Sequence, residues 1–230
     1  MSKGEMNSRI TTIFFDVGNT LLFPNHERIH RPLAERGVTP GPEHLRDLER
    51  RTKNKFDSLM TQNGSHDHSF WWMFYTQLMQ ELNLNDDLLR DQLVTAIRNS
   101  ANWDRILPGT CERLQQIGAQ YRIGVISNAD GKIDQVLAKC EIAPCFLTIT
   151  DSGLIGFEKP RPEIFQHALA SLNAKPQESL YVGDVYSVDY LGATAAGMQA
   201  ILMDVSGAYR DKGVPRVESL EELHSVVRSS

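Results

Sequence analysis

The stretch ITTIFFDVGNTLL, residues 10–22, joins a largely apolar run to a polar turn. The run from Ile10 to Phe15 suits a short buried strand, and Asp16 and Gly18 after it are typical of a tight loop. A carboxylate in this place stands at the end of a strand. Ligands bind at the carboxyl ends of the strands in parallel sheets, so Asp16 is a first candidate for a functional residue.

Outward from this segment, further apolar runs alternate with stretches of helical spacing. The apolar runs are Arg122–Ile126, Phe146–Thr150, Ser179–Val182 and Gln199–Met203. The helical stretches are Thr110–Gln120, Lys132–Lys139, Pro162–Leu172 and Tyr190–Ala196. Alternation of this kind predicts right-handed βαβ units, and so an α/β fold with a Rossmann-like parallel sheet and helices on both of its faces.

The interval between residues 23 and 105 breaks this alternation. It has helical spacing and many charges but no convincing strand, and Pro108 with Gly109 marks the return to the alternating pattern. We therefore predict a helical cap domain of residues 23–105, inserted into a core domain of residues 1–22 and 106–230. Aromatic side chains of the interval should form the cap's own core and its seam with the core domain. They are Phe70, Trp71, Trp72, Phe74 and Tyr75.

The composition is that of an ordinary globular protein. Of the 230 residues, 41% are hydrophobic and 23% charged, the net charge is -5, and the basic residues are spread along helix-like segments. No apolar cluster is long enough to cross a bilayer, and residues 1–9 lack the apolar segment of a secretory signal. Cys111, Cys140 and Cys145 show no CxxC spacing and suit a reducing compartment. We expect a cytoplasmic protein that binds neither nucleic acid nor membranes.

Four polar clusters follow the predicted strands or open the next helix. They are Asp16 to Thr20, Ser127 with Asn128, Lys159 within Glu158 to Pro162, and Gly183-Asp184 with Asp189. Each cluster alone is a weak signal, because an Asp after a strand is often a turn former and a Ser-Asn pair can simply begin a helix. Together they converge on one edge of one sheet, and this convergence indicates a functional site.

The residue types in these clusters are those that the transfer of a phosphoryl group needs. A carboxylate can attack phosphorus and form an aspartyl-phosphate. A hydroxyl, an amide and a lysine can hold the oxygens of the phosphate, where negative charge must be balanced. Magnesium takes a few carboxylate or carbonyl ligands, which makes Asp16 and Asp184 candidate ligands. The metal would also reduce the repulsion between an anionic nucleophile and an anionic phosphate.

The same clusters resemble the four motifs of the haloacid dehalogenase-like hydrolases. In order, the matching segments are Phe15 to Leu22, Ile126 to Asn128, Ser152 to Phe165, and Val182 to Asp184 with Asp189 and Gly192 to Met198. The match spans nearly the whole predicted core domain. An insertion between the first and second motifs is similar to the small helical cap of the subgroup that holds phosphoglycolate phosphatase-like enzymes and 2-haloacid dehalogenases.

The resemblance implies a metal site and a nucleophile. Asp16 is expected to be the nucleophile and a magnesium ligand. The other protein ligands are expected to be Asp184 and the main-chain carbonyl of Gly18, and Asp189 should support this metal site. The resemblance also implies the strand order 5-4-1-2-3, with the five predicted strands numbered along the chain and the strand before Asp16 in the centre.

It also implies how the substrate is held. Ser127 and Asn128 are expected to bind the substrate through its phosphate, and Lys159 to steady both the nucleophile and the phosphate. Lys159 is thus expected to take part in catalysis as well as in binding.

The sequence departs from the family pattern at Gly18. Most phosphatases of the superfamily carry a second Asp there as general acid and base, and the loss of such a group lowers the rate by about 10²–10⁴. The substrate is then an acyl or aryl phosphate that needs no protonation, or a cap residue such as His26, Glu27 or His30 replaces the carboxylate, or the protein chiefly binds a ligand or partner. We expect His26 and His30 to be an exposed pair. A positive φ at Gly18 would offer another reason for the glycine.

Two other enzyme classes of the superfamily remain as alternatives. A haloacid dehalogenase needs no magnesium, so the acidic pair Asp184 and Asp189 argues against it. A phosphonoacetaldehyde hydrolase-like enzyme tolerates a small residue at position 18 but needs a cap lysine that forms a Schiff base. Lys53 and Lys55 lie in a charge-rich stretch, and we expect both to be solvated. The pattern His66-Asp67-His68 is too weak to predict a metal site.

We therefore predict a magnesium-dependent hydrolase of the phosphatase type. Its substrate is expected to be a small phosphorylated metabolite, either a phosphate ester or an acyl phosphate, cleaved through an aspartyl-phosphate. The alternatives are a weak or inactive relative used for binding, and a hydrolase of C–P or C–halogen bonds. The sequence leaves the substrate's identity and the oligomeric state open.

Overall fold

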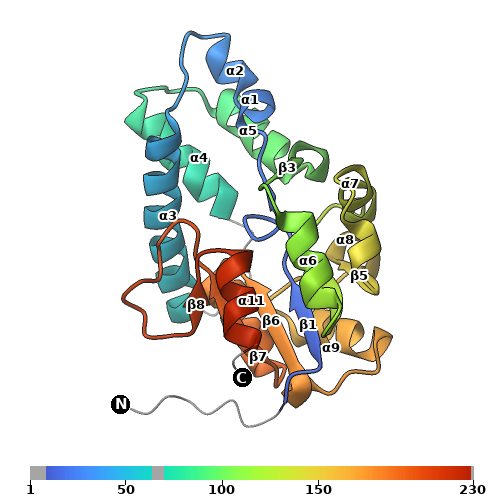
Figure 1. Cartoon of the computed structure of the whole chain (residues 1–230). Coiled ribbons are helices and arrows are strands. Elements are labelled where there is room, and N and C mark those ends of the chain that lie inside the picture. The colour runs from blue at the N-terminus through green and yellow to red at the C-terminus, as the bar shows by residue number, and fades with distance from the viewer. Residues whose placement is uncertain (1–8, 64–69, 229–230) are drawn as a thin grey trace.

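A parallel sheet of six strands organises the computed structural model, which describes residues 9–63 and 70–228 (Figure 1). The strands are β1 (Thr12–Phe15), β4 (Arg122–Ser127), β5 (Thr148–Asp151), β6 (Ser179–Gly183), β7 (Gln199–Met203) and β8 (Arg216–Val217). Their order is β5-β4-β1-β6-β7-β8, which matches the expected order and adds β8 at one edge. The predicted Rossmann-like α/β class is therefore confirmed.

Strand β1 is central because its whole length is suited to burial. All four of its residues are buried, and it pairs in parallel with β4 on one side and β6 on the other. A strand covered on both faces needs a nearly continuous apolar run instead of an alternating one. Successive side chains point to opposite faces, so Ile13 and Phe15 belong to one core cluster and Phe14 to another.

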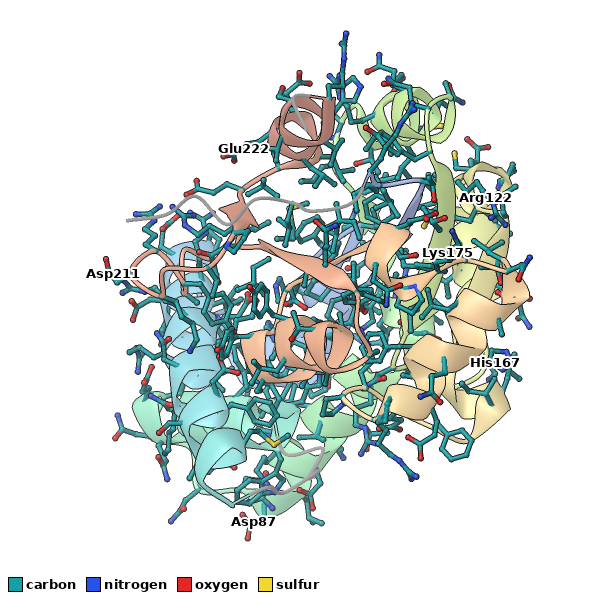
Figure 2. The ribbon with its side chains drawn as sticks, turned by 90° about the horizontal axis from the view of Figure 1, so that it is seen from below. Asp87, Arg122, His167, Lys175, Asp211 and Glu222 are labelled. Atoms are coloured by element: carbon teal, nitrogen blue, oxygen red, sulfur yellow. The ribbon has the colours of Figure 1, made fainter. Side chains whose placement is uncertain are left out.

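Helices cover both faces of the sheet. On the face of Phe15 lie α6 (Thr110–Gly118), α7 (Ile133–Lys139) and α11 (Leu220–Arg228). On the face of Phe14 lie α9 (Pro162–Ser171) and α10 (Leu191–Ala195). The connections contain the short helices η2 (Ala143–Cys145), α8 (Ser152–Ile155) and η3 (Pro176–Glu178). Figure 2 shows Glu222 of α11 and His167 of α9 on the outside of these layers.

Between β2 (Leu22–Phe23) and β3 (Arg105–Ile106) the described chain is helical. It forms α1 (His26–Ile29), α2 (Arg31–Ala34), α3 (Pro42–Asn63), α4 (Phe70–Glu81), α5 (Asp87–Arg98) and the 3-10 turn η1 (Ser100–Asn102). Figure 1 shows these helices gathered beyond one end of the sheet. The expectation of no strand in this interval is wrong at its two ends, where β2 and β3 pair antiparallel. A two-residue strand is too short to show an alternating pattern.

The aromatic side chains of α4 fill the space between helices and reach the sheet end. Phe74 and Tyr75 are buried, and Trp71 packs edge to face on Trp103, with ring centroids 5.6 Å apart. The prediction that these aromatic residues are core is wrong for Trp72, which is 46% exposed. Trp71 and Trp72 therefore differ in environment although they are neighbours in the sequence.

Candidate active site

The predicted site residues meet at the carboxyl ends of the central strands. Asp16 follows β1 directly, Ser127 is the last residue of β4, and Asp184 follows Gly183, the last residue of β6. Because these strands are parallel neighbours, their ends lie at one edge of the sheet. Lys159 reaches the same point from the segment before α9. All four side chains are buried.

Lys159 is the centre of a buried network of hydrogen bonds. Its ammonium group donates to Oδ1 of Asp16 at 2.6 Å, to Oδ1 of Asp189 at 2.7 Å and to the hydroxyl of Tyr181 at 2.8 Å. Three acceptors satisfy the three N–H groups of an ammonium, so the lysine is held in one position. Sequence reasoning missed Tyr181, because an aromatic residue inside an apolar strand suggests core packing. Its hydroxyl, which needs a partner when buried, was the signal available.

Asn128 holds the segment that carries Lys159. Its carboxamide accepts a hydrogen bond from the Lys159 main-chain N–H at 2.8 Å and donates to the Lys159 carbonyl at 3.0 Å. Both contacts are with the main chain, so they fix the segment against the end of β4. Asn128 also lines the cavity described below. Its contacts favour a positioning role over the direct substrate binding expected from the sequence.

Asp189 shapes the loop that carries Asp184. Its Oδ2 accepts hydrogen bonds from the main-chain N–H groups of Asp184 at 3.1 Å and Val185 at 2.9 Å. The loop continues into a single π-helical turn, η4 (Tyr186–Tyr190), a rare conformation that is frequent at functional sites. A Cβ on Gly183 would lie only 2.5 Å from Cγ of Asp189. Glycine at position 183 therefore leaves the room that the Asp189 carboxylate needs.

Burial opposes the ionisation of the acidic groups in this cluster. Burial, opposed by Lys159 and reinforced by the nearby Asp189 and Asp184, raises the pKa of Asp16 from 3.8 to about 7. Burial also raises the pKa of Asp184 to about 6, against the attraction of Lys53. For Lys159 burial favours the neutral amine, but the adjacent Asp16 and Asp189 raise its pKa well above the ordinary value.

The donor set fits a hard divalent cation. Oxygen atoms of Asp16, Asp184 and Asp189 all lie within 4.8 Å of one another, and carboxylate oxygens are the donors that Mg²⁺ prefers. Four carboxylates face two ammonium groups here, namely Asp16, Glu49, Asp184 and Asp189 with Lys53 and Lys159. When ionised, the cluster has an excess of two negative charges, which one divalent cation would balance.

Helix α3 presents three charged side chains to the loops of the site. Glu49, Lys53 and Asp57 are four residues apart, so they share one face of the helix. Nζ of Lys53 lies 2.7 Å from Oδ2 of Asp184 and 2.8 Å from Oε1 of Glu49. Asp57 accepts a hydrogen bond from a main-chain N–H of η4 at 2.9 Å. The prediction that Lys53 is solvated is wrong, since its side chain is 1% exposed, whereas Lys55 is exposed as predicted.

A cavity of about 410 Å³ adjoins these polar groups and has the size of a small-molecule site. Its polar end is lined by the predicted residues Asp16, Gly18, Ser127, Asn128, Lys159, Asp184 and Asp189. Another part of the lining is apolar and comes from the helical segment. Its members are Phe56, Met60, Phe70, Trp71, Ile97 and Trp103, and we call them the apolar wall.

Trp103 packs directly on Gly18. A Cβ built on Gly18 would lie 3.3 Å from Cζ3 of the indole. The φ of Gly18 lies outside the left-handed region, so a positive φ is not the reason for this glycine. The indole N–H donates to the carbonyl of Ile97 at 2.7 Å, which fixes the ring. Trp103 therefore stands where the family's second Asp side chain would extend.

The histidines considered as replacement acids do not reach the cavity. His26, Glu27 and His30 are all absent from its lining. The rings of His26 and His30 stack, with centroids 4.9 Å apart, but only His26 is exposed. His30 is buried, with Nε2 3.2 Å from the Tyr75 hydroxyl, so the expected exposed pair is wrong for His30. His66-Asp67-His68 lies outside the described residues.

The fold and the buried acid–lysine cluster define the class of protein, a hydrolase with a Rossmann-like core. Residues 10–197 match the haloacid dehalogenase-like hydrolases, and the chain belongs to this family. The resemblance seen in the sequence is thereby confirmed. Among the described residues, every helix is too short or too polar to span a bilayer.

Relatives with known names fall into the same family. A glyceraldehyde 3-phosphate phosphatase of Methanothermobacter thermautotrophicus is 40% identical over 111 residues, which are 46% of this chain and about half (49%) of that protein. The haloacid dehalogenase-like hydrolase domain-containing protein 3 of Homo sapiens is 26% identical over 85% of this chain and 82% of its own. The pyrimidine 5'-nucleotidase YjjG of Escherichia coli is 25% identical over 93% of this chain and 95% of its own.

Solved structures share the fold. The putative hydrolase YfnB from Bacillus subtilis, bound to magnesium, has a TM-score of 0.69 at 19% identity and covers 96% of this chain and 99% of its own. L-2-haloacid dehalogenase from Xanthobacter autotrophicus has a TM-score of 0.60 at 18% identity, and the match covers 95% of this chain and 98% of that chain. At these identities the likeness concerns the fold alone.

Proposed function

We propose that this hydrolase is a magnesium-dependent phosphatase that acts on a small phosphorylated metabolite through an aspartyl-phosphate on Asp16. The observation that carries the proposal is the 2.6 Å contact between Asp16 and Lys159 at the polar end of a cavity that Ser127 also lines. An ammonium that touches the nucleophilic carboxylate can also reach an anion placed beside it. Phosphoryl transfer depends on such positioning and charge balance.

The residues of the polar end have different roles in a transfer that takes two steps. Asp16 attacks phosphorus in line with the leaving oxygen, and the Ser127 hydroxyl and the Lys159 ammonium hold the oxygens of the phosphate. Water then attacks the aspartyl-phosphate, which releases phosphate and restores the carboxylate.

Magnesium would be held by Asp16, Asp184 and the carbonyl of Gly18. Bound there, it would balance the negative charge that gathers on nucleophile and phosphate. Asp189 supports this site through the loop of Asp184, which it holds by two main-chain hydrogen bonds. The excess of negative charge in the cluster supports this part of the proposal.

Two relatives support a phosphorylated substrate, because they are named as a phosphatase and a nucleotidase. The candidates are a phosphate ester or an acyl phosphate. We further propose that residues 23–105 act as a cap domain on a core domain of residues 1–22 and 106–230, since the apolar wall comes from the helical segment and the polar end comes from the sheet. A cytoplasmic location remains a prediction.

The burial of Lys53 does not favour a Schiff-base enzyme. Schiff-base chemistry needs a neutral amine. Burial favours the neutral form, but Asp184 and Glu49 raise the pKa of Lys53 well above its ordinary value, so it is an ammonium here. A dehalogenase, which needs no metal, would not require the excess negative charge around Asp184.

Assays with and without metal test the proposal. Purified protein should hydrolyse acetyl phosphate or an aryl phosphate in Mg²⁺, lose this activity in excess chelator and regain it when Mg²⁺ is restored. Full activity in chelator would contradict the metal site and favour the dehalogenase alternative. If the folded protein with Mg²⁺ hydrolyses neither acetyl phosphate nor any aryl phosphate tested, the binding-only alternative is favoured.

A further inference from the structure

We propose that the apolar wall binds an aromatic ring, and that the substrates are aryl phosphates, in which a phenolic oxygen carries the phosphate. The inference rests on the proposed function and narrows its substrate class. Two features lead to it: the chemistry of the wall, and the position of one of its members, Trp103, on Gly18 beside the nucleophile.

The aromatic members of the wall form a continuous chain of rings. Phe56 contacts Phe70 with ring centroids 5.7 Å apart, Phe70 contacts Trp71 at 4.9 Å, and Trp71 contacts Trp103 at 5.6 Å, all edge to face. Such a surface gains free energy from an aromatic partner. It offers few hydrogen bonds to a hydroxyl-rich metabolite, whose polar groups would lose water without compensation.

Several polar groups that line the cavity already have hydrogen-bond partners. The Ser100 hydroxyl and the Asp130 carboxylate, which both line the cavity, are hydrogen-bonded to each other. Asn128 is occupied by the main chain of Lys159. The lining also includes the charged residues Arg98 and Glu158, whereas the surface formed by the apolar wall suits an apolar group.

Trp103 brings this wall to the scissile bond. Gly18 is two residues from Asp16, and the indole lies against it. A group bonded directly to the transferred phosphate therefore meets Trp103 first and Trp71 next. An aryl ester places its ring directly beside the transferred phosphate, next to Trp103. A long polar linker would hold the ring farther from both.

The chemistry at position 18 selects the same substrates. When Asp16 bonds to phosphorus, the P–O bond to the leaving group breaks and its electron pair goes to the leaving oxygen. A phenol has a pKa of about 10, as in tyrosine, so its anion can leave without a proton and take one from water after release. Water then hydrolyses the aspartyl-phosphate to phosphate and the free carboxylate. An alkyl ester would need an acid that neither Gly18 nor Trp103 supplies.

The test compares Trp71→Leu with Trp72→Leu, a matched control on the same helix whose side chain lies outside the cavity. The probes are phenyl phosphate, 2-phenylethyl phosphate (a ring on an alkyl oxygen) and acetyl phosphate (no ring, no proton needed), all with Mg²⁺. The wild type should turn over phenyl phosphate at least about 10²-fold faster than 2-phenylethyl phosphate. Trp71→Leu should raise the KM for phenyl phosphate about tenfold and that for acetyl phosphate, which has no ring, by much less. Trp72→Leu should change neither.

The outcomes separate this inference from the proposed function. If Trp71→Leu hydrolyses phenyl and acetyl phosphate as the wild type does, the aryl site is overturned and the phosphatase stands. Equal kcat for phenyl and 2-phenylethyl phosphate would contradict the claim that the leaving oxygen departs without a proton. If the folded wild type hydrolyses none of the three probes, the proposed phosphatase function is itself contradicted, and the aryl site with it. Circular dichroism serves as the check that Trp71→Leu is folded.

Discussion

At the residue scale, the small size of Gly18 allows the indole of Trp103 to pack against it. The backbone of Gly18 would accept an L residue, since its φ is not in the left-handed region. A side chain there would be crowded by the indole, whose Cζ3 would lie 3.3 Å from a Cβ and would have to shift by a few tenths of an ångström. The absence of an acid at position 18 and the presence of Trp103 in the apolar wall therefore go together.

We predict that Gly18→Asp alone gives little alkyl phosphatase activity, because the indole occupies the space of the carboxylate. Gly18→Asp with Trp103→Phe should raise kcat/KM for 2-phenylethyl phosphate by about 10², since the shorter ring withdraws the atoms that face Gly18. Steady-state rates in Mg²⁺ measure this, with Trp103→Phe alone as the control. Equal rates for the single and the double variant would show that the indole does not obstruct the acid.

Sequence reasoning found the polar residues at or just after the strand ends and missed side chains that reach the site from the helical segment. Asp16, Ser127 and Asp184 were visible because a polar residue directly after an apolar run has few structural reasons to be there. Lys53 and Trp103 were not, because a charge on a helix and an aromatic residue in a loop each suit an ordinary surface or core. Only the packing of the helical segment on the sheet reveals that both reach the site.

At the scale of elements, the face of α3 ties the helical segment to the loops of the sheet. Lys53 is held between Glu49 of its own helix and Asp184 of the loop after β6. It neutralises a carboxylate that we propose as a magnesium ligand. Lysine and metal therefore act on the same group, and the contribution of Lys53 to stability should depend on whether the metal is present.

We predict that Lys53→Met lowers the free energy of unfolding by about 3 kcal/mol in chelator, because it leaves buried carboxylates without their partner. In saturating Mg²⁺ the loss should be smaller, since the metal would balance Asp184. Urea unfolding under the two conditions measures the difference. Lys55→Met, two residues along the helix and exposed, should have little effect in either condition. An equal loss for Lys53→Met with and without Mg²⁺ would argue against Asp184 as a ligand.

The contact between His30, which lies between α1 and α2, and Tyr75 of α4 leads to a separate prediction about pH. Burial lowers the pKa of His30, beside the Tyr75 hydroxyl, to about 3. The unfolded chain takes up a proton near pH 6.5 and the folded chain does not, so stability is complete above pH 6.5 and falls as the pH drops toward 3. At pH 5 this group should cost about 2 kcal/mol.

His30→Gln should remove that part of the pH dependence. The change in the free energy of unfolding between pH 7.5 and pH 5 should shrink by about 2 kcal/mol relative to wild type. His167→Gln is the control, because His167 lies exposed on α9 and faces outward (Figure 2). The same pH dependence in His30→Gln and wild type would show that His30 titrates normally.

At the scale of the whole molecule, alternation of apolar runs and helices was enough to predict the class of fold. The central strands β1, β4 and β6 are almost wholly buried and so appear as apolar runs. β2, β3 and β8 have two residues each, which is too few for any pattern. How the helical segment meets the sheet depends on contacts between residues far apart in sequence, such as Trp103 with Gly18. No local periodicity encodes these contacts.

The candidate site lies where the two parts of the molecule meet. Its polar end follows β1, β4 and β6, and its apolar wall comes largely from α3, α4 and α5. A ligand that binds there, and only to the folded chain, should stabilise both parts together. We predict that Mg²⁺ with beryllium fluoride, which forms a phosphate-like adduct on an ionised carboxylate, raises the free energy of unfolding beyond the effect of Mg²⁺ alone. At 100 times its Kd the adduct should contribute about 2.7 kcal/mol.

Asp16→Asn identifies the carboxylate that forms this adduct. The variant should fold, lose turnover by a factor of about 10³ or more, and show no increment of stability from beryllium fluoride, since a carboxamide cannot bond to beryllium in this way. Ca²⁺ in place of Mg²⁺ should give a smaller increment and inhibit turnover, because its larger and more flexible shell positions the carboxylate poorly for in-line attack. Urea unfolding with each metal, with and without the fluoride, measures all of these effects. A full fluoride increment in Asp16→Asn would place the adduct on another group and remove Asp16 from the mechanism.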